Sequence, residues 1–146
     1  MEVVILCGGK GTRLSEETIS KPKPMVEIGG KPILWHIMKS YSIYGYKKFI
    51  LALGYKGYII KDYFYNARIN QSDFTLKMDP SENPIFHNTI IEKDWEISFI
   101  NTGEETLKGG RLKKIEKYIK SENFFVTYGD GLSNINIEEL FEFHKK

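Results

Sequence analysis

The sequence predicts an α/β protein in which a mainly parallel β-sheet is covered by helices on both faces and one small β-hairpin is inserted. Short apolar runs at 3–6, 49–53 and 124–128 are typical of strands buried on both faces of a parallel sheet. Segments with apolar residues at helical spacing separate these runs. Repeated strand and helix units of this kind form parallel sheets with right-handed crossovers.

The length and composition fit one folded domain. Of the 146 residues, 41% are hydrophobic, which is enough to fill a core and excludes disordered chains and small disulfide scaffolds. The net charge of +2 does not favour wrapping of nucleic acid or adhesion to a membrane, so we expect neither as a partner. Cys7 is the single cysteine, and no secretory signal or membrane-length apolar run is present, which favours a cytoplasmic location.

The first half of the chain alternates between the two kinds of element. A strand over 3–6 is followed by a helix over 32–44, where proline suits the first helical position and Gly45 marks the end. A second strand over 49–53 and a second helix over 58–64 come next. The apolar residues on the two helical faces are Ile33, Leu34, Ile37, Met38 and Tyr41, then Ile59, Ile60, Tyr63 and Phe64.

The pattern changes to strict alternation between residues 66 and 94. Phe74, Leu76 and Met78 alternate with polar residues, a turn-rich segment follows at 80–84, and a second extended run continues beyond it. This pattern predicts a β-hairpin.

The last part of the chain returns to strand and helix units. The spacing predicts a strand over 97–100, a helix over 111–120 and a buried strand over 124–128. Asn136 is the expected N-cap of a final helix, with Glu139 three residues later. Because the chain ends with this helix and not with a closing strand, we expect a portion of a longer domain.

A glycine-rich segment, LCGGKGTRL at 6–14, directly follows the first strand. Glycines allow a backbone to approach a ligand closely, so that successive N–H groups can converge on phosphate oxygens. Lys10 and Arg13 add positive charge at the same place. The alternative is an ordinary tight turn with solvated cations, but the two cations and the preceding strand favour anion binding.

Two other phosphate-binding motifs do not fit the spacing. A Walker A loop ends in Gly-Lys-Ser/Thr, and neither glycine-lysine pair, at 9–10 or at 30–31, is followed by such a residue. The dinucleotide fingerprint needs a glycine where Leu14 stands, and Gly54 and Tyr55 take the place of the acidic residue that would bind ribose. A P-loop is excluded, and a dinucleotide-dependent oxidoreductase is disfavoured.

Two further segments supply charged side chains after predicted elements. In KPKPM at 21–25 each proline favours an extended lysine before it, and the alternative is a solvated loop. Asp130 lies between two glycines after the strand over 124–128, which suits a ligand for Mg²⁺, and the alternative is a simple turn. If that strand pairs with the first one, Asp130 and the glycine-rich segment flank one crevice at the topological switch point, a geometry suited to metal-assisted transfer at a nucleoside triphosphate.

The assembled segments resemble a known family. VVILCGGKGTRL, followed by KPKPMVEIGGKPILWHIM, resembles the sugar-nucleotide pyrophosphorylases, also called nucleotidylyltransferases. The segments SEETISKPKPMVEIGGKPILWHIMK, GYKGYIIKDYF, 102–112 and TYGDGL are most similar to the members that use CTP. The resemblance covers all 146 residues and implies a Rossmann-like nucleotidyltransferase fold.

The resemblance also implies roles for individual residues. Arg13 and Lys23 would be catalytic, and Asp130 would bind Mg²⁺ as the cofactor. The implied reaction joins CTP and glucose 1-phosphate into CDP-glucose and diphosphate, with the sugar phosphate attacking the α-phosphorus in line and no protein nucleophile. The implied nucleotide-binding residues are Leu6, Gly8, Gly9, Gly11, Thr12, Arg13, Lys23, Thr102, Arg111 and Gly129.

Some features depart from the family pattern. Cys7 stands where the family usually has alanine, and the family's sugar-binding part and a second metal-binding aspartate lie beyond residue 146. We therefore expect residues 1–146 to be the N-terminal, nucleotide-binding part of a nucleotidyltransferase domain. Two alternatives stay open, a non-catalytic nucleotide-binding module and a pyrophosphorylase of the family with another nucleotide or sugar phosphate. The strand over 124–128 would keep an open edge unless another chain or sequence beyond residue 146 covers it, so we expect the 146-residue chain by itself to associate as a homo-oligomer.

We expect Arg13→Ala to lower turnover of the full-length enzyme by about 10²-fold or more, because a positioned guanidinium stabilises the charge that accumulates in the transition state. Folding should change little, since the side chain belongs to a loop. Steady-state turnover and thermal unfolding of both proteins are the measurements. An Arg13→Ala enzyme with near-normal turnover would contradict the assignment.

Overall fold

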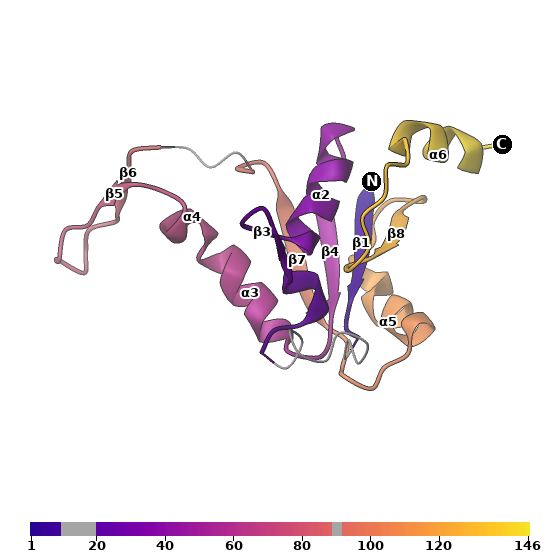
Figure 1. Cartoon of the computed structure of the whole chain (residues 1–146), viewed down its shortest axis with the longest axis horizontal. Coiled ribbons are helices and arrows are strands. Elements are labelled where there is room, and N and C mark those ends of the chain that lie inside the picture. The colour runs from indigo at the N-terminus through magenta and orange to yellow at the C-terminus, as the bar shows by residue number, and fades with distance from the viewer. Residues whose placement is uncertain (10–19, 89–91) are drawn as a thin grey trace.

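The centre of the fold is a four-stranded parallel sheet. The structure, a computed structural model, describes residues 1–9, 20–88 and 92–146. The strands lie in the order β7-β4-β1-β8, and all neighbours are parallel, as the sequence predicts (Figure 1). Their bounds are Glu2–Cys7 for β1, Lys48–Leu53 for β4, Glu96–Asn101 for β7 and Phe125–Tyr128 for β8.

Alternate residues of β1 and β4 enter two separate cores. Val3 and Ile5 of β1 face the side covered by α2 (Ile33–Ile43) and α3 (Gly57–Tyr65). Val4 faces the opposite side, where it packs with Ile115 of α5 (Lys108–Ile115). All four side chains are fully buried. The prediction of helices on both faces of the sheet is therefore confirmed.

The helices begin and end close to where the sequence places them. Pro32 is the N-cap of α2 and not its first residue, and Gly45, with φ +86°, lies just beyond its end. The helix predicted over 111–120 begins earlier, as α5, and continues as a 3₁₀ turn, η2 (Glu116–Tyr118). Asn136 caps α6 (Ile137–His144) as predicted, since its Oδ1 accepts the backbone N–H groups of residues 138 and 139 at 3.0 and 3.2 Å. None of the helices in the described part of the chain has the length and apolar character that crossing a membrane requires.

The prediction that 124–128 forms a buried strand is wrong in one respect. β8 lies at the edge of the sheet and pairs only with β1 among the described strands. Phe125 is buried, but Val126 and Tyr128 are 45% and 50% exposed. An apolar run predicts a strand, but only its neighbours in the sheet decide whether both faces are covered.

The predicted insertion is a hairpin with very short strands. β5 (Phe74–Thr75) pairs antiparallel with β6 (Ile85–Phe86), after a single helical turn, α4 (Ala67–Asn70). Figure 1 shows this hairpin projecting away from the sheet beyond α3 and α4. Leu76 and Met78, which the alternation assigned to a strand, lie outside it and are exposed.

Residues 21–25 are not extended throughout, contrary to the prediction. Pro22 is extended, but Lys23–Met25 form a 3₁₀ turn, η1, in which the Met25 N–H donates to the Pro22 carbonyl at 2.8 Å. Burial of Pro24 and Met25 against the sheet favours this turn over a solvated extended chain. A small hairpin that the sequence analysis missed follows, formed by β2 (Glu27–Ile28) and β3 (Lys31–Pro32) around two glycines with positive φ.

The carboxylate of Glu2 connects the start of β1 to the chain entering β8. Its two oxygens accept the backbone N–H groups of Lys120 and Ser121, both at 3.2 Å. Burial raises the pKa of Glu2, but hydrogen bonds from the Ser121 hydroxyl and these backbone groups outweigh burial and hold the pKa below its usual range. The charged form is therefore the one that stabilises the fold.

We expect Glu2→Gln to lower the free energy of unfolding at pH 7 by about 1–2 kcal/mol, because an amide donates where the backbone needs an acceptor. A carboxyl group with a lowered pKa stabilises the folded state above its unfolded pKa, so the difference between the two proteins should shrink as the pH falls below about 4. Urea unfolding between pH 3 and pH 7 measures it.

Glu96→Gln is the matched control, because the Glu96 side chain is 70% exposed and faces Lys48 at 3.8 Å. It should change stability by less than about 0.5 kcal/mol. A wild-type minus Glu2→Gln difference that stays constant over the whole pH range would show that the Glu2 charge does not stabilise the fold.

Candidate functional site

Most of the predicted site residues that the structure describes line one pocket at the carboxyl ends of the parallel strands. Its volume is about 350 Å³, within the range of small-molecule sites. It lies where the chain leaves β1 toward β4 on one side and returns as β8 on the other, the topological switch point of the sheet. The walls come from residues 6–9, 23–24 and 104–108 and from Arg111, Tyr128 and Asp130.

A smaller cavity, of about 200 Å³, lies among aromatic side chains that include Trp35, Tyr63 and Trp95. None of the predicted site residues lines it. The pocket at the strand ends is therefore the candidate site.

The first wall is the backbone that follows β1. Gly8 is buried and Gly9 is exposed at the pocket. A Cβ on Gly8 would lie 2.1 Å from Cζ of Arg111, so a side chain there would displace the buried guanidinium, whereas a Cβ on Gly9 would meet open space. The rest of the predicted glycine-rich loop lies outside the described residues, including the predicted site residues Gly11, Thr12 and Arg13.

A second part of the pocket lining brings Lys23 and Asp130 together. Lys23 Nζ, from η1, lies 2.6 Å from Asp130 Oδ2, in the loop after β8, and both side chains are about one-third exposed. Gly129 places Asp130 at this point, because its N–H donates to the Leu6 carbonyl at 3.0 Å and so extends the pairing of β8 with β1. The sequence suggested Lys23 and Asp130 separately, and the fold makes them an ion pair.

Arg111 lies at the back of the pocket and is only 5% exposed. Its Nη1 donates to Thr102 Oγ1 at 2.6 Å and to the Gly103 carbonyl at 2.7 Å, and its Nη2 donates to the carbonyls of Gly8 at 2.9 Å and Glu104 at 3.0 Å. Burial lowers the pKa of Arg111, but a guanidinium stays charged at neutral pH.

Thr102 is buried behind Arg111 and does not line the pocket. Its hydroxyl and its backbone N–H both donate to the Leu53 carbonyl, at 2.7 and 2.8 Å. Thr102 therefore faces the sheet, and any help that it gives in holding a nucleotide acts through Arg111.

Cys7 is buried beside the pocket and acts as a small apolar residue. Burial, together with the negative charge of Asp130, raises the pKa of its thiol well above the usual range. The thiol therefore stays protonated at neutral pH and is not a nucleophile.

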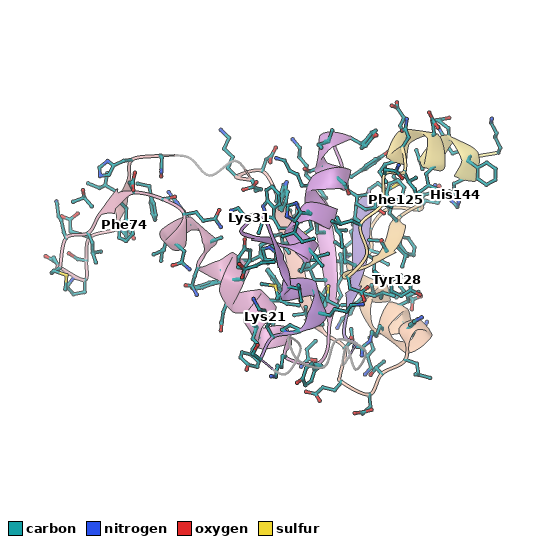
Figure 2. All side chains as sticks on the ribbon, viewed as in Figure 1. Lys21, Lys31, Phe74, Phe125, Tyr128 and His144 are labelled. Carbon is teal, nitrogen blue, oxygen red and sulfur yellow. The ribbon has the colours of Figure 1, made fainter. Side chains whose placement is uncertain are left out.

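The sequence analysis missed several residues at the pocket, among them Lys108 and Tyr128. Lys108, at the start of α5, places its Nζ 4.8 Å from the ring centroid of Tyr128. Figure 2 shows Tyr128 beside α5, at the end of the sheet where β8 finishes. Tyr128 directly precedes the Gly-Asp-Gly segment, and this position in the sequence could have marked it as a site residue. Its contact with Lys108 was not predictable in the same way, because it depends on β8 pairing with β1.

The side chains at the pocket suit a metal ion that takes only part of its ligands from the protein and the rest from phosphate and water. No cluster of three or more His, Cys, Asp or Glu residues suited to a metal occurs within residues 1–9, 20–88 and 92–146. Asp130 lines the pocket together with the backbone predicted to bind phosphate, and Glu104 and Glu105 line it as well. This donor set suits Mg²⁺, which takes one or two carboxylates and completes its shell with phosphate oxygens and water.

Comparison with known proteins identifies the family. Residues 2–146 match the family model described as nucleotidyl transferase. The chain belongs to this nucleotidyl transferase family. The predicted resemblance to nucleotidylyltransferases and the predicted Rossmann-like nucleotidyltransferase fold are both confirmed.

Two similar relatives are bacterial proteins described as cytidylyltransferases. The chain is 52% identical over 146 residues to a glucose-1-phosphate cytidylyltransferase of Salmonella typhimurium strain LT2. It is 49% identical over 145 residues to a probable glucose-1-phosphate cytidylyltransferase of Bacillus subtilis strain 168. The alignments cover 99% of this chain but 56% of each relative, so the chain spans little more than half the length of these nucleotidyl transferases.

Two solved structures are similar as well. HddC from Yersinia pseudotuberculosis, complexed with GMP-PN, matches with a TM-score of 0.65 and 32% identity over 97% of this chain and 52% of that one. A UDP-glucose pyrophosphorylase complexed with UDP-glucose matches with a TM-score of 0.69 over 99% of this chain and 54% of that one. Because its identity is 19%, the second match shows the nucleotidyl transferase fold alone.

Proposed function

We propose that residues 1–146 form the nucleotide-binding part of an enzyme that makes CDP-glucose and diphosphate from CTP and glucose 1-phosphate. The main support is the Lys23–Asp130 ion pair of 2.6 Å, which lines the same pocket as the Gly8–Gly9 backbone. This pocket contains a cation that can bind phosphate, a carboxylate that can bind a metal ion and a glycine backbone that a ligand can approach closely. The 52% identity to the Salmonella cytidylyltransferase supports the choice of substrates.

In the proposed nucleotide site, one group of residues contacts the base and another contacts the phosphates. Leu6 supplies an apolar wall of the pocket near the base, and the N–H groups of the glycine-rich segment bind phosphate oxygens. Gly129 lets Asp130 approach closely, since a Cβ there would lie 2.9 Å from Cys7 Sγ. Thr102 and Arg111 complete the set as the wall behind the phosphate loop. The other members of the proposed set are Gly11, Thr12 and Arg13.

Catalysis in this proposal needs no protein nucleophile. The attacking group is the phosphate of glucose 1-phosphate, so the protein contributes alignment and charge neutralisation. Lys23 exchanges its bond to Asp130 for phosphate oxygens when nucleotide binds, and Arg13 adds a second cation. Mg²⁺ held by Asp130 would supply further neutralisation of the triphosphate charge.

The proposal includes a location and an association state. A cytoplasmic location is supported by the single cysteine, which is buried and protonated, and by the need for a nucleoside triphosphate. β8 is an edge among the described strands, and its Val126 and Tyr128 are about half exposed, so self-association is proposed where no further sequence covers this edge.

We expect Asp130→Asn to abolish the Mg²⁺ dependence of CTP affinity while the fold stays intact, because an amide keeps the shape but lacks the charge that holds a hard cation. Without Mg²⁺, CTP affinity should stay equal or rise, since Lys23 loses its carboxylate partner. Titration calorimetry with and without Mg²⁺ measures both effects.

Asp62→Asn is the control, because it removes the same charge from an exposed position on α3 that does not line this pocket. It should bind CTP like the wild-type protein. If Asp130→Asn keeps the wild-type Mg²⁺ dependence, Asp130 belongs to an ordinary turn and not to a metal site.

We expect the 146-residue chain to bind CTP weakly and to release no measurable diphosphate with CTP, glucose 1-phosphate and Mg²⁺. Alignment of reactants accounts for about 7–11 kcal/mol of barrier reduction in well-oriented reactions, so a sugar phosphate that is not held reacts too slowly to detect. A chimera that adds the remaining segment of the Salmonella relative should be active with CTP.

The two proteins are compared by diphosphate release with CTP, UTP, dTTP and GTP. Equal rates for the chain and the chimera would show that 1–146 is a complete catalytic unit. Nucleotide binding with no activity in the chimera would favour a non-catalytic nucleotide-binding module. Activity of the chimera with a different nucleotide would favour another pyrophosphorylase of the family.

A further inference from the structure

We propose that the aromatic cavity of about 200 Å³ binds a single neutral sugar ring, at a site separate from the nucleotide pocket. Its lining includes Trp35 of α2, Tyr63 of α3 and Trp95, which directly precedes β7. The cavity lies on the face of the sheet that α2 and α3 cover (Figure 1). It shares no described lining residue with the nucleotide pocket, so a sugar site here does not depend on the proposed function.

One polar atom of the cavity lining has no hydrogen-bond partner. The Glu92 side chain is 14% exposed, and its Oε1 is buried without a donor. Lys39 Nζ lies 4.0 Å from this oxygen, which is beyond hydrogen-bonding distance. Among the described residues, only Ser72 has another buried side-chain atom of this kind. A buried acceptor without a donor is unfavourable, so the cavity favours an occupant that carries an O–H or N–H group.

The charges around the cavity favour a neutral occupant. The Nζ atoms of Lys31 and Lys39 already lie 5.6 and 5.8 Å from the centroid of the Trp35 ring, and Lys93 lines the cavity. A positively charged ligand would be repelled by these ammonium groups. A negatively charged ligand would be repelled by the Glu92 carboxylate and by the negative faces of the aromatic rings. An uncharged ligand with hydroxyl groups avoids both kinds of repulsion.

The two tryptophan rings exclude a nucleobase stacked between them. Rings that enclose a planar base lie parallel and about 7 Å apart, because each of the two contacts takes about 3.5 Å. The centroids of Trp35 and Trp95 are only 6.1 Å apart, and the ring planes differ by 39°. The volume of about 200 Å³ is also smaller than that of sites for drug-sized ligands, which favours a single ring over a whole nucleotide.

A hexopyranose has the chemistry that this lining favours. Its C–H groups are weakly positive and pack on the negative faces of aromatic rings. Its hydroxyl groups both donate and accept, so one can donate to Glu92 Oε1 while another accepts from the Lys93 ammonium group. Gln71 also lines the cavity, but its Oε1 already accepts from Lys31 Nζ at 2.6 Å. Glu92 is therefore the acceptor that a sugar hydroxyl would satisfy.

The chain contains two tryptophans, and both line this cavity. Their indole N–H signals in ¹⁵N NMR spectra therefore report on the cavity directly. The probes are the methyl α-glycosides of glucose, galactose and mannose, which carry no phosphate for the nucleotide pocket. We expect at least one of them to shift both indole signals saturably, with a dissociation constant of about 1–10 mM, because a ligand of one ring makes few contacts.

The decisive variant is Glu92→Gln. We expect its affinity for the glycoside to fall by about tenfold, because a hydrogen bond to a carboxylate is about twice as strong as one to a neutral amide. Its thermal unfolding midpoint should not fall, since the variant removes a buried charge that has no donor. A residue with a merely structural role would show the opposite pattern, a loss of stability with unchanged binding.

Glu116→Gln is the matched control, because the Glu116 side chain is 65% exposed on η2 and does not line the cavity. It should bind the glycoside like the wild-type protein.

A second variant, Ala67→Leu, tests the location of the site. Ala67 lines the cavity from α4, and a leucine there fills part of the volume without removing a polar group. We expect the saturable indole shifts to disappear, while circular dichroism shows an intact fold. Glycoside binding of wild-type strength in this variant would contradict a site in the cavity.

A free monosaccharide and the end unit of a glycan present the same ring. The α-linked disaccharide that ends in the ring of the bound glycoside is therefore titrated as well. Equal affinities would indicate a site for the free monosaccharide, and tighter binding of the disaccharide would indicate a site for the end of a glycan.

Other occupants of the cavity give different results, and each of them overturns the proposal. Indole shifts with tetramethylammonium but with no glycoside would indicate a site for organic cations. No shift with any glycoside at about 100 mM, tenfold or more above the expected constant, would indicate a cavity that holds water alone. Glycoside binding that Glu92→Gln leaves unchanged would show that Glu92 is not the acceptor. These results are independent of CTP binding, so a failure of the sugar site is distinguishable from a failure of the proposed function.

Discussion

The double pairing of β1 is the constraint on which the rest of the structure depends. Val3, Val4 and Ile5 are fully buried, and the strand has parallel neighbours on both edges. A strand held in this way cannot shift its register without exposing its apolar residues. Its carboxyl end is therefore a fixed point, and the Gly8–Gly9 backbone, the Lys23–Asp130 pair and the Arg111 guanidinium are all arranged around it.

Three cations and three carboxylates line the described part of the pocket. Lys23, Lys108 and Arg111 supply the positive charge, and the negative charge comes from Glu104, Glu105 and Asp130. In the free protein each of these cations has a partner, which is Asp130, the Tyr128 ring or the backbone. Lys23 is partly exposed and Lys108 is exposed, so a phosphate can reach both, whereas the Arg111 guanidinium is held by Thr102 and four main-chain carbonyls. The site thus combines two exchangeable cations with one fixed cation.

The molecule also has surfaces that its own described residues leave uncovered. β8 forms one edge of the sheet, and the β5–β6 hairpin projects away from the main body (Figure 1). Two-residue strands are too short to be stable alone, and this hairpin relies on contacts such as the Arg68 guanidinium 3.8 Å from the Phe86 ring centroid. The hairpin contributes no side chain to the nucleotide pocket, whereas β8 contributes Tyr128 at its end.

The sequence by itself determined the order of strands and helices, because continuous apolar runs and helical spacing report burial directly, as in 3–6 and 49–53. It also determined that Gly8, Lys23 and Asp130 follow or flank strands, where parallel sheets bind ligands. Only the tertiary structure decided that β8 lies at an edge, that Lys23 pairs with Asp130 and that Arg111 faces carbonyls from three loops. Each of these depends on which strands become neighbours, and contacts between residues as far apart as Gly8 and Arg111 leave no periodic signal in a single sequence.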